Sequence, residues 1–378
     1  MGRVKHGGRL RVLEVAPRFP PLAGGVEQHV AELAARLVEA GVDVQVLTTN
    51  PDGRLPASEV HRGVEVRRVP VLPVGSDLYI APSLMGAIAR SGPWDLVHVH
   101  SYQTFVAPLA MLGARRAHLR YVVTFHSGGH SSTLRNSIRG AQVAVLGPLL
   151  RRARRLIAVS EFERTLFAAR LGISAERIAL IPTGAQMPVP VDVSPDPEPL
   201  ILSVGRLERY KGHQRAIAAM PDVLAQVPNA RLRIAGAGPY EGALQRMVTR
   251  AGLADRVEIA AVPPQDRAGM ATLLSRASVA VLLSDYEASP ASVMEALALR
   301  RPVVVAYTSG LMEFADRGQV RAVPIDAEPA TVAAAIVREI REPLAPSPIS
   351  IPTLDATTAS LLQLYREAVA PPGREGPA

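Results

Sequence analysis

The fold of this chain is constrained above all by the alternation of short apolar runs with segments of helical periodicity. In the first half, the runs with the length and composition of buried strands are residues 10–16, 44–48, 96–100, 121–125 and 156–159. Between the first two, Val26, Val30, Leu33 and Leu37 mark one face of a helix that ends near Gly41. This alternation is typical of a parallel sheet covered by helices on both faces, so we predict an α/β fold.

A second α/β unit is predicted after an interruption at 187–199 that is rich in proline and acidic residues. Beyond it the alternation resumes, with strands expected at 200–204, 231–235, 257–260, 279–283, 302–306 and 320–325, and helices at 216–227 and 291–299. We therefore expect an N-terminal domain over 1–186, a linker over 187–199 and a C-terminal domain over 200–350, both doubly wound. The remaining residues, 351–378, contain an amphipathic segment at 354–369 that can pack on either domain.

The composition limits the classes of function that fit. The 378-residue chain contains no cysteine, which excludes disulfides and thiolate metal sites. It has no apolar run long enough to span a membrane, and its first apolar run is too short for a signal peptide, so we expect a cytoplasmic protein. The net charge of +8 favours an anionic partner: a nucleotide diphosphate, a phospholipid surface or a phosphorylated acceptor. With aromatic residues at only 4%, and arginines not interleaved with stacking residues, we do not expect nucleic acid binding.

The first candidate site is the paired glycine Gly24-Gly25, which lies between the first predicted strand and its helix. Ligands of parallel sheets bind at the carboxyl ends of strands, and glycine lets the backbone approach them closely. The N-terminus of the following helix could bind a phosphate. The sequence is not G-x-G-x-x-G, and an ordinary tight turn explains the pair equally well.

The second candidate site follows the first strand of the second unit and contains Arg206 and Lys211. Only Lys5 and Lys211 are lysines, whereas the other basic residues are arginines, so position 211 is expected to require a compact ammonium group. A basic pair at the mouth of a parallel sheet is suited to neutralising a leaving diphosphate. The alternative is a chance surface lysine.

The third candidate site is bounded by Glu287, in a loop, and Glu295, about one turn inside the next predicted helix. Carboxylates accept hydrogen bonds from sugar and ribose hydroxyls, and these two could reach one ligand from different heights. A helix cap and an unrelated surface charge would give the same spacing.

Histidines end two predicted strands of the first unit. His98 and His100 share a strand face, and His126 ends the next strand. A metal site is conceivable, but the sequence has no H-E-x-x-H and no carboxylate close to these residues. It also lacks the D-x-D pattern with which many sugar-nucleotide enzymes hold a divalent cation. We therefore expect hydrogen-bonding roles in a cleft, and no metal.

Taken together, these segments resemble the retaining glycosyltransferases of family 4, which have the GT-B architecture of two facing Rossmann-like domains. The resemblance runs nearly end to end, and its specificity comes from the order and spacing of its last three motifs. The matching segments are 24–27, 98–100, 124–126, 181–184, 204–212, Ala235-Gly236-Ala-Gly238-Pro239, and the E-x₇-E of Glu287 and Glu295.

The resemblance implies roles for the candidate residues. Arg206 and Lys211 would contact the diphosphate of a UDP-, GDP- or ADP-sugar, with the backbone of Gly24–Gly25 against it. His126 would lie near the anomeric carbon. Within the third site, Glu287 would hold sugar hydroxyls, Glu295 the ribose, and Ser289, Ala291 and Ser292 would complete the donor site. The predicted catalytic residues are His126, Arg206, Lys211 and Glu287. The final helix would cross back to the N-terminal domain.

The chain departs from the family pattern inside this motif. The aromatic residue and the glycine that usually follow the first glutamate are replaced by Ser289 and Pro290, and Pro290 lacks a backbone N–H. The turn before Pro302 has Arg300-Arg301 in place of a glycine. These differences leave the geometry of donor-sugar binding open.

The expected activity is transfer of a hexosyl group to a hydroxyl acceptor (a glycan, a lipid-linked acceptor or a small molecule) with retention and without a metal or other cofactor. The alternatives are a sugar-nucleotide epimerase or phosphorylase of the same fold, and a non-catalytic partner subunit that binds sugar nucleotides. The arginines at 151, 152, 154 and 155, with those at 115, 116 and 120, could also attract the anionic inner face of a membrane. An ordinary arginine-rich surface is the alternative.

Overall fold

The computed structural model describes residues 9–22, 24–76, 78–127, 139–184, 187–188, 190, 196–263, 266–344 and 352–370. These residues divide into two compact units. Unit 1 contains the described residues up to Ser127, those from Arg139 to Thr183, and those from Leu354 onward. Unit 2 contains the described residues from Gly184 to Thr353. The predicted linker falls partly, and the tail at 371–378 wholly, outside the described residues.

Unit 1 is built on a sheet with the strand order β3-β4-β2-β1-β5-β6-β7-β8. Its strands are β1 (Arg11–Val15), β2 (Asp43–Asn50), β3 (Ser58–His61), β4 (Val64–Pro70), β5 (Leu96–His100), β6 (Arg120–Thr124), β7 (Arg155–Ala158) and β8 (Ile178–Leu180). All neighbours are parallel except β3 and β4, which are antiparallel. The sheet is therefore parallel, as predicted, except at this edge.

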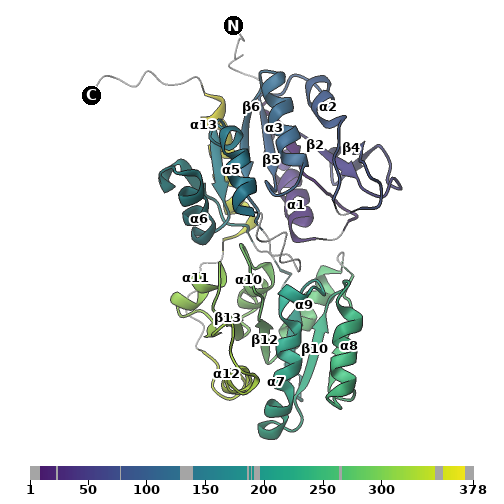
Figure 1. Ribbon diagram of the computed structural model, residues 1–378, viewed down its shortest axis with the longest axis vertical. Helices are drawn as coiled ribbons and strands as arrows, with labels where there is room; N and C mark the ends of the chain where they lie inside the picture. Colours follow the sequence, from purple (N-terminus) through teal and green to yellow (C-terminus); the bar gives the residue numbers. More distant parts are fainter. Residues whose placement is uncertain are drawn as a thin grey trace, which may run out of the picture. The chain divides into compact units, whose positions relative to one another are not determined.

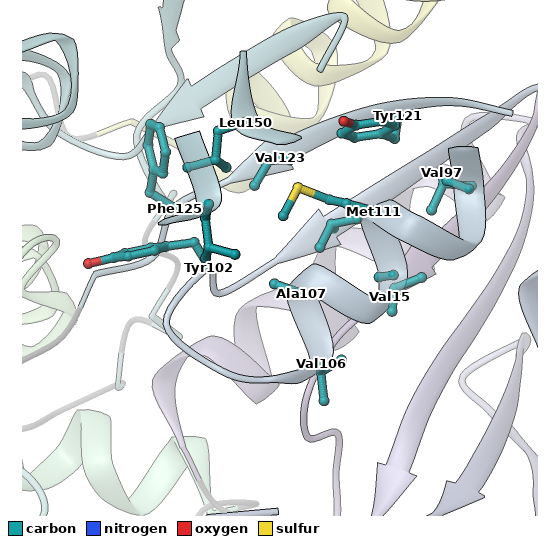
Figure 2. Packing of buried hydrophobic residues seen from close by; sticks show 14 of the residues in the cluster. Val15, Val97, Tyr102, Val106, Ala107, Met111, Tyr121, Val123, Phe125 and Leu150 are labelled. Atoms are coloured by element: carbon teal, nitrogen blue, oxygen red, sulfur yellow. The ribbon is translucent and has the colours of Figure 1, made fainter. Parts of the chain in front are cut away.

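Helices cover both faces of this sheet (Figure 1). The helices α1 (Gly25–Glu39) and α13 (Leu354–Val369) share one apolar core with it, and the other core takes α2 (Leu84–Arg90), α3 (Val106–Arg116), α5 (Arg139–Leu150) and α6 (Glu161–Leu171). Figure 2 shows part of the second core, where Val15, Val97 and Val123 of the strands meet side chains of α3. The fully buried strand β5 carries His98 and His100 between these layers.

The helix α13 returns the end of the chain to unit 1, where it contacts α1, β5 and β6. Its apolar face buries Leu361, Leu364 and Ala368. Tyr365 lies on the same face and is fully buried. The hydroxyl group of Tyr365 therefore lies against the middle of the sheet, although α13 is distant from these strands in sequence.

Unit 2 is built on an entirely parallel sheet with the strand order β11-β10-β9-β12-β13-β14. Its strands are β9 (Leu200–Val204), β10 (Arg231–Ala235), β11 (Val257–Ile259), β12 (Val279–Leu282), β13 (Val303–Ala306) and β14 (Arg321–Val323). One face packs on α7 (His213–Gln226), α8 (Glu241–Arg250) and α12 (Pro329–Arg341), and the other on α9 (Arg267–Arg276), α10 (Ala291–Ala298) and α11 (Leu311–Asp316). This is the strand order of a Rossmann fold.

The predicted fold class, two doubly wound α/β units with parallel sheets, is confirmed. In each sheet the chain lays its first strands on one side of the initial strand and then switches to the other side, between β1 and β5 in unit 1 and between β9 and β12 in unit 2. Open α/β sheets bind ligands at such switch points. Of the helices in the described parts of the chain, none combines the length and apolarity needed to cross a membrane.

Candidate functional site

Lys211 and Glu287 meet at the switch point of unit 2. Lys211 follows β9 and Glu287 follows β12, and these two strands are hydrogen-bonded neighbours. The Lys211 Nζ donates to Glu287 Oε1 at 2.6 Å, and both side chains are largely buried. Burial lowers the pKa of Lys211, but attraction to Glu287 outweighs this, so the net pKa lies above its usual value. The two residues therefore form a charged pair where a ligand of this sheet is expected.

Lys211 is positioned by the backbone of a short 3₁₀ turn, Arg209–Lys211, that leads into α7. Gly212 joins them with a left-handed φ of +77°, and a Cβ atom there would lie 1.9 Å from the carbonyl oxygen of Leu283. Only glycine fits this close approach. His213 then donates from Nε2 to the carbonyl of Arg206 at 3.2 Å and accepts at Nδ1 from Ser203 Oγ at 2.8 Å, which ties the turn to β9.

The Glu287 carboxylate is held from several sides. Ser284 Oγ donates to Glu287 Oε1 at 2.8 Å, beside Lys211. The Glu287 backbone N–H donates to Ser309 Oγ at 2.7 Å, and its carbonyl accepts from the Gly310 N–H at 2.8 Å. The loop that follows β13 thereby fixes the loop that follows β12. Glu287 is thus a pre-positioned acceptor group.

Arg206 is exposed, and its Nη2 donates to the hydroxyl of Tyr210 at 2.9 Å. The ring of Tyr210 lies against Lys211, with Nζ at 5.4 Å from the ring centroid. Tyr210 therefore connects the two basic residues that the sequence singled out, and both lie beside the end of β9. No sequence pattern marks Tyr210 as a site residue.

Glu295 lies inside α10 and is paired with Arg267 of α9, whose Nη2 is 2.6 Å from Glu295 Oε1. No sequence pattern marks Arg267, because α9 and α10 meet only through the tertiary fold. At the start of α10, Pro290 is the N-cap residue and the Ala291 N–H donates to the Ser289 carbonyl at 3.1 Å. Ser289, Ala291 and Ser292 therefore lie at the N-terminus of the helix that carries Glu295.

In unit 1 the predicted histidines gather around a carboxylate that sequence analysis missed. Glu14 lies on β1 directly opposite His98 of the neighbouring β5 and is fully buried. Its Oε2 is 3.0 Å from His98 Nδ1 and 2.7 Å from His100 Nε2, and its Oε1 accepts from the Tyr365 hydroxyl at 2.7 Å. His98 Nε2 also contacts Thr124 Oγ1 at 2.7 Å. An acidic residue inside an apolar strand was the available signal.

The electrostatics of this cluster follow from its burial. Burial alone would raise the pKa of Glu14, but attraction to His98 and the hydrogen bonds from His100 and His98 hold it well below its usual range. Burial and the nearby His98 lower the pKa of His100 to about 4, against the opposing effect of Glu14. At neutral pH the cluster therefore contains an ionised Glu14 and a neutral His100.

His126 joins the cluster from the loop after β6, since its Nε2 lies 3.0 Å from His100 Nδ1. Its backbone has a left-handed φ of 47°, and Gln103 Nε2 donates to its carbonyl at 3.0 Å. Burial and the neighbouring histidines lower the pKa of His126 far below its usual value. His126 is therefore a neutral, buried side chain held by contacts on both ring and backbone.

Glu163 of α6 fixes the residue that follows His126. Its Oε1 accepts from both the N–H and the hydroxyl of Ser127, at 2.5 and 2.6 Å, and its Oε2 accepts from the Val159 N–H at 3.0 Å. The side chain of Ser160 caps the same helix by accepting from the Glu163 N–H. The Ser-x-x-Glu spacing at 160–163 is the sequence pattern of a capping box and could have identified this support.

Gly24 and Gly25 begin α1, with Gly24 as its N-cap residue. A Cβ atom at Gly24 would lie 2.0 Å from Glu27 Oε2, so the carboxylate of Glu27 folds back onto the helix N-terminus, whereas nothing lies within 4 Å of the corresponding position on Gly25. An acidic group already lies where the sequence predicted a phosphate. A phosphate at this N-terminus would require Glu27 to move.

Within the described part of the chain, one carboxylate–histidine cluster has the spacing of a metal site: Glu14, His98 and His100, whose ligand atoms lie within 4.8 Å of one another. Each of these side chains also hydrogen-bonds within the cluster. The group could accommodate a cation, or it could serve as a hydrogen-bonded network. Its internal bonds are sufficient to satisfy the donors and acceptors.

Comparison with known protein families identifies this chain of two Rossmann-like units as a glycosyltransferase. The family model described as Glycosyltransferase Family 4 matches residues 23–186, and that described as Glycosyl transferases group 1 matches residues 190–345. The chain therefore belongs to the group 1, family 4 glycosyltransferases and is a glycosyltransferase.

The relatives are transferases of several kinds. The glycogen synthase of Mycobacterium tuberculosis is 31% identical, over 89% of this chain and 87% of its own. The D-inositol 3-phosphate glycosyltransferase of Nocardiopsis dassonvillei is 29% identical, over 92% and 91%. These names do not favour the epimerase or partner-subunit alternatives.

Solved structures share the GT-B fold. The sucrose-phosphate synthase from Thermosynechococcus elongatus superposes with a TM-score of 0.77 at 23% identity, covering 95% of this chain and 99% of that one. Anabaena HepE, solved with UDP and glucose, superposes with a TM-score of 0.73 at 19% identity, covering 95% and 100%. At these identities the similarity describes the fold alone.

Proposed function

We propose that the protein transfers a hexosyl group from a UDP-, GDP- or ADP-sugar to a hydroxyl acceptor, with retention of configuration and without a metal ion or other cofactor. The observation that carries this proposal is the Lys211–Glu287 pair at the β9/β12 switch point. An ammonium group has three donors, so Lys211 can keep its bond to Glu287 and still donate to a diphosphate oxygen.

The remaining residues of unit 2 fit a sugar nucleotide. Glu287 is held as an acceptor for sugar hydroxyls, and Arg206 adds positive charge at the end of the same strand. Glu295 is proposed to bind the ribose, a role in which it would exchange Arg267 for two hydroxyl groups. Ser289, Ala291 and Ser292 would line the donor at the N-terminus of α10. The contact of Gly24–Gly25 with the diphosphate would require the carboxylate of Glu27 to move away from the start of α1.

Retention is proposed to proceed on one face of the sugar. The carboxylate of Glu287 is engaged by Lys211 and Ser284, and that of Glu14 is buried beneath its histidines, so both are suited to orientation and not to attack. In the proposed step the bond from the anomeric carbon to the leaving phosphate breaks as the bond to the acceptor oxygen forms. The acceptor proton passes to the leaving phosphate. Lys211 and Arg206 would stabilise the charge that develops on it.

The donor is identified first. Thermal unfolding with UDP-, GDP- and ADP-glucose should show stabilisation by one nucleotide class, since a ligand at about 100 times its Kd stabilises by about 2.7 kcal/mol. With that donor, Lys211→Ala should lower kcat by a factor on the order of 10²–10³, because a charge-stabilising donor is lost. The matched control is Arg209→Ala, which removes an exposed cation from the same turn.

The outcomes separate the parts of the proposal. Near-wild-type kcat in folded Lys211→Ala would remove the basis for the assignment of the donor site. The anomeric proton coupling of the product distinguishes retention from inversion. Turnover that disappears in a chelator and returns with a divalent cation would contradict metal independence.

We further propose that the protein is cytoplasmic and that it contacts the inner face of an anionic membrane through unit 1. Where α5 ends and β7 begins, a hollow of about 230 Å³ is lined by Arg151, Arg154, Arg155 and Arg177 with Glu176 among them. Each arginine near a lipid surface contributes about 1 kcal/mol. Co-sedimentation with phosphatidylglycerol vesicles should exceed that with phosphatidylcholine and weaken in Arg154→Ala/Arg155→Ala; equal sedimentation with both lipids would contradict the contact.

A further inference from the structure

Four side chains from separate segments of unit 1 form one hydrogen-bonded chain that ends at His126. The order is Tyr365 of α13, Glu14 of β1, His100 of β5 and His126 after β6, with successive distances of 2.7, 2.7 and 3.0 Å. All four side chains are buried. Buried polar groups need hydrogen-bond partners, and each group in this chain has the next one as its partner. The donor and acceptor of each hydrogen bond are therefore constrained by the adjacent hydrogen bonds.

The direction is set at Glu14, because a carboxylate can only accept hydrogen bonds. Tyr365 therefore donates its hydroxyl proton to Glu14 Oε1, and His100 donates from Nε2 to Glu14 Oε2. The His98 Nδ1 approaches both the Tyr365 oxygen, at 2.5 Å, and Glu14 Oε2, at 3.0 Å, and it too must act as a donor toward the carboxylate. Three donors thus converge on one carboxylate.

The same logic continues through the two imidazole rings. A neutral imidazole that donates at Nε2 must accept at Nδ1. His100 is neutral, so its Nδ1 accepts from His126 Nε2, which carries the proton. His126, itself neutral, is then left with its lone pair at Nδ1. The tautomer of His126 is thereby determined by Glu14, two residues away along the chain of bonds.

We propose that Glu14 is a positioning residue that holds His126 as the Nε2–H tautomer, so that its Nδ1 accepts a hydrogen bond from a hydroxyl group of the donor or acceptor sugar. This inference rests on the proposed function, in which His126 lies near the anomeric carbon. Tyr365 supports Glu14 from the C-terminal helix. The stacked rings of His100 and His126, with an interplanar angle of 24° and centroids 5.3 Å apart, restrict the same side chain further.

The tautomer can be measured directly by ¹⁵N NMR of the histidine rings, without any assumption about activity. The chain has nine histidines, and the His126 signals are assigned by their loss in His126→Gln. In the wild-type protein we expect a protonated Nε2 and an unprotonated Nδ1. A proton on Nδ1 of wild-type His126 would overturn the proposal.

Glu14→Met tests the cause. A methionine of similar length offers His100 no carboxylate, so the proton of His100 should move to Nδ1 and that of His126 should move to Nδ1 in turn. We expect kcat to fall by about tenfold, the value of roughly one hydrogen bond, with the donor KM within about twofold of wild type. An unchanged His126 tautomer, or a switched tautomer with unchanged kcat, would contradict the proposal.

Two further variants separate positioning from simple structural support. Glu14→Gln can still offer an amide oxygen to His100 and should restore both the wild-type tautomer and most of the turnover. Tyr365→Phe removes only one donor from Glu14 and should retain the wild-type tautomer. If Glu14→Gln is folded but as impaired as Glu14→Met in both readouts, the acceptor role is wrong.

Two further experiments distinguish this inference from a metal site at Glu14 and from the proposed donor site. Spectra recorded before and after chelator treatment should superimpose; a change in the His98 and His100 signals would indicate that Glu14 serves a bound cation instead and would overturn the proposal. If Lys211→Ala retains full turnover while the NMR results are as expected, the proposed donor site fails and the Glu14 chain stands.

Discussion

Single charged residues at the unit 2 switch point are neutralised by partners from other elements. Glu287 is paired with Lys211, 76 positions away in the sequence, and Glu295 is paired with Arg267. Both glutamates are more buried than a surface carboxylate, and an unpaired buried charge is costly. The pairs therefore keep both carboxylates ordered in the folded protein.

Glu295→Gln should separate binding from turnover. The ribose that Glu295 is proposed to bind lies away from the reacting carbon. Loss of its hydrogen bonds to Glu295 should therefore weaken binding of the ground state and of the transition state equally. We expect the donor KM to rise by about 10- to 100-fold, which corresponds to about 1.5–3 kcal/mol for a hydrogen bond to a charged group, with kcat nearly unchanged. Steady-state kinetics measures this difference.

The control for this variant is Glu258→Gln, which breaks the exposed ion pair with Arg233 at 2.7 Å. It should leave both constants unchanged, because surface pairs contribute little. A tenfold loss of kcat in Glu295→Gln at unchanged KM would place Glu295 in the chemical step and not at the ribose.

At the scale of elements, the approach of one loop to another decides where the catalytic candidates lie. The turn that carries Lys211 and the strand end at Leu283 touch through Gly212, which has both a left-handed backbone and no room for a side chain. Gly252, after α8, shares the left-handed conformation, with a φ of +65°, but nothing lies within 4 Å of a Cβ atom there. Substitution of Gly252 therefore tests backbone strain alone, whereas substitution of Gly212 tests backbone strain together with close packing.

Gly212→Ala should destabilise unit 2 far more than Gly252→Ala. A left-handed alanine alone costs about 1 kcal/mol, whereas a clash with a fixed carbonyl adds about 1–3 kcal/mol or more. Urea unfolding should report these losses of free energy. Equal losses in the two variants would show that the loop after β12 can move away from Gly212 at no cost.

The molecule as a whole contains buried or half-buried histidines whose lowered pKa values should shape its stability. Burial lowers the pKa of His29 to about 3 and that of His213 to about 4, and His100 is similar. An unfolded histidine takes up a proton near pH 6.5, whereas these folded ones do not until the pH is much lower. Between these values the unfolded state binds more protons, so the stability that is present above pH 6.5 is lost as the pH falls.

Each such histidine should contribute a slope of about 1.4 kcal/mol per pH unit to the free energy of unfolding between pH 6 and the folded pKa. Glu14 should extend the loss below pH 4.5, since its folded pKa is depressed too. Denaturation measured from pH 7 to pH 4 should show this decline. His213→Asn should lower the slope of the unit 2 transition by about 1.4 kcal/mol per pH unit, because one proton fewer is taken up on unfolding. An undiminished slope in His213→Asn would mean that His213 is charged in the folded protein.

How far the sequence predicted the fold depended on the burial of each strand. Strands buried on both faces are continuous apolar runs and were predicted to within a few residues, as with β5 and β9. In β4, buried and exposed residues alternate, with Glu65 and Arg67 facing outward, and it pairs with the exposed β3. Neither forms an apolar run, so the antiparallel edge was missed.

The sequence by itself determined the two α/β units, the strand ends at which ligands are expected, and the identity of Lys211, Glu287 and His126 as candidates, because periodicity and unusual residue choice are local properties. Only the tertiary structure decided their partners. Glu14, Arg267 and Tyr365 come from elements remote in sequence, and strand order and helix packing bring them to His100, Glu295 and Glu14. Their protonation and charge depend on burial and on those partners, which no local pattern encodes.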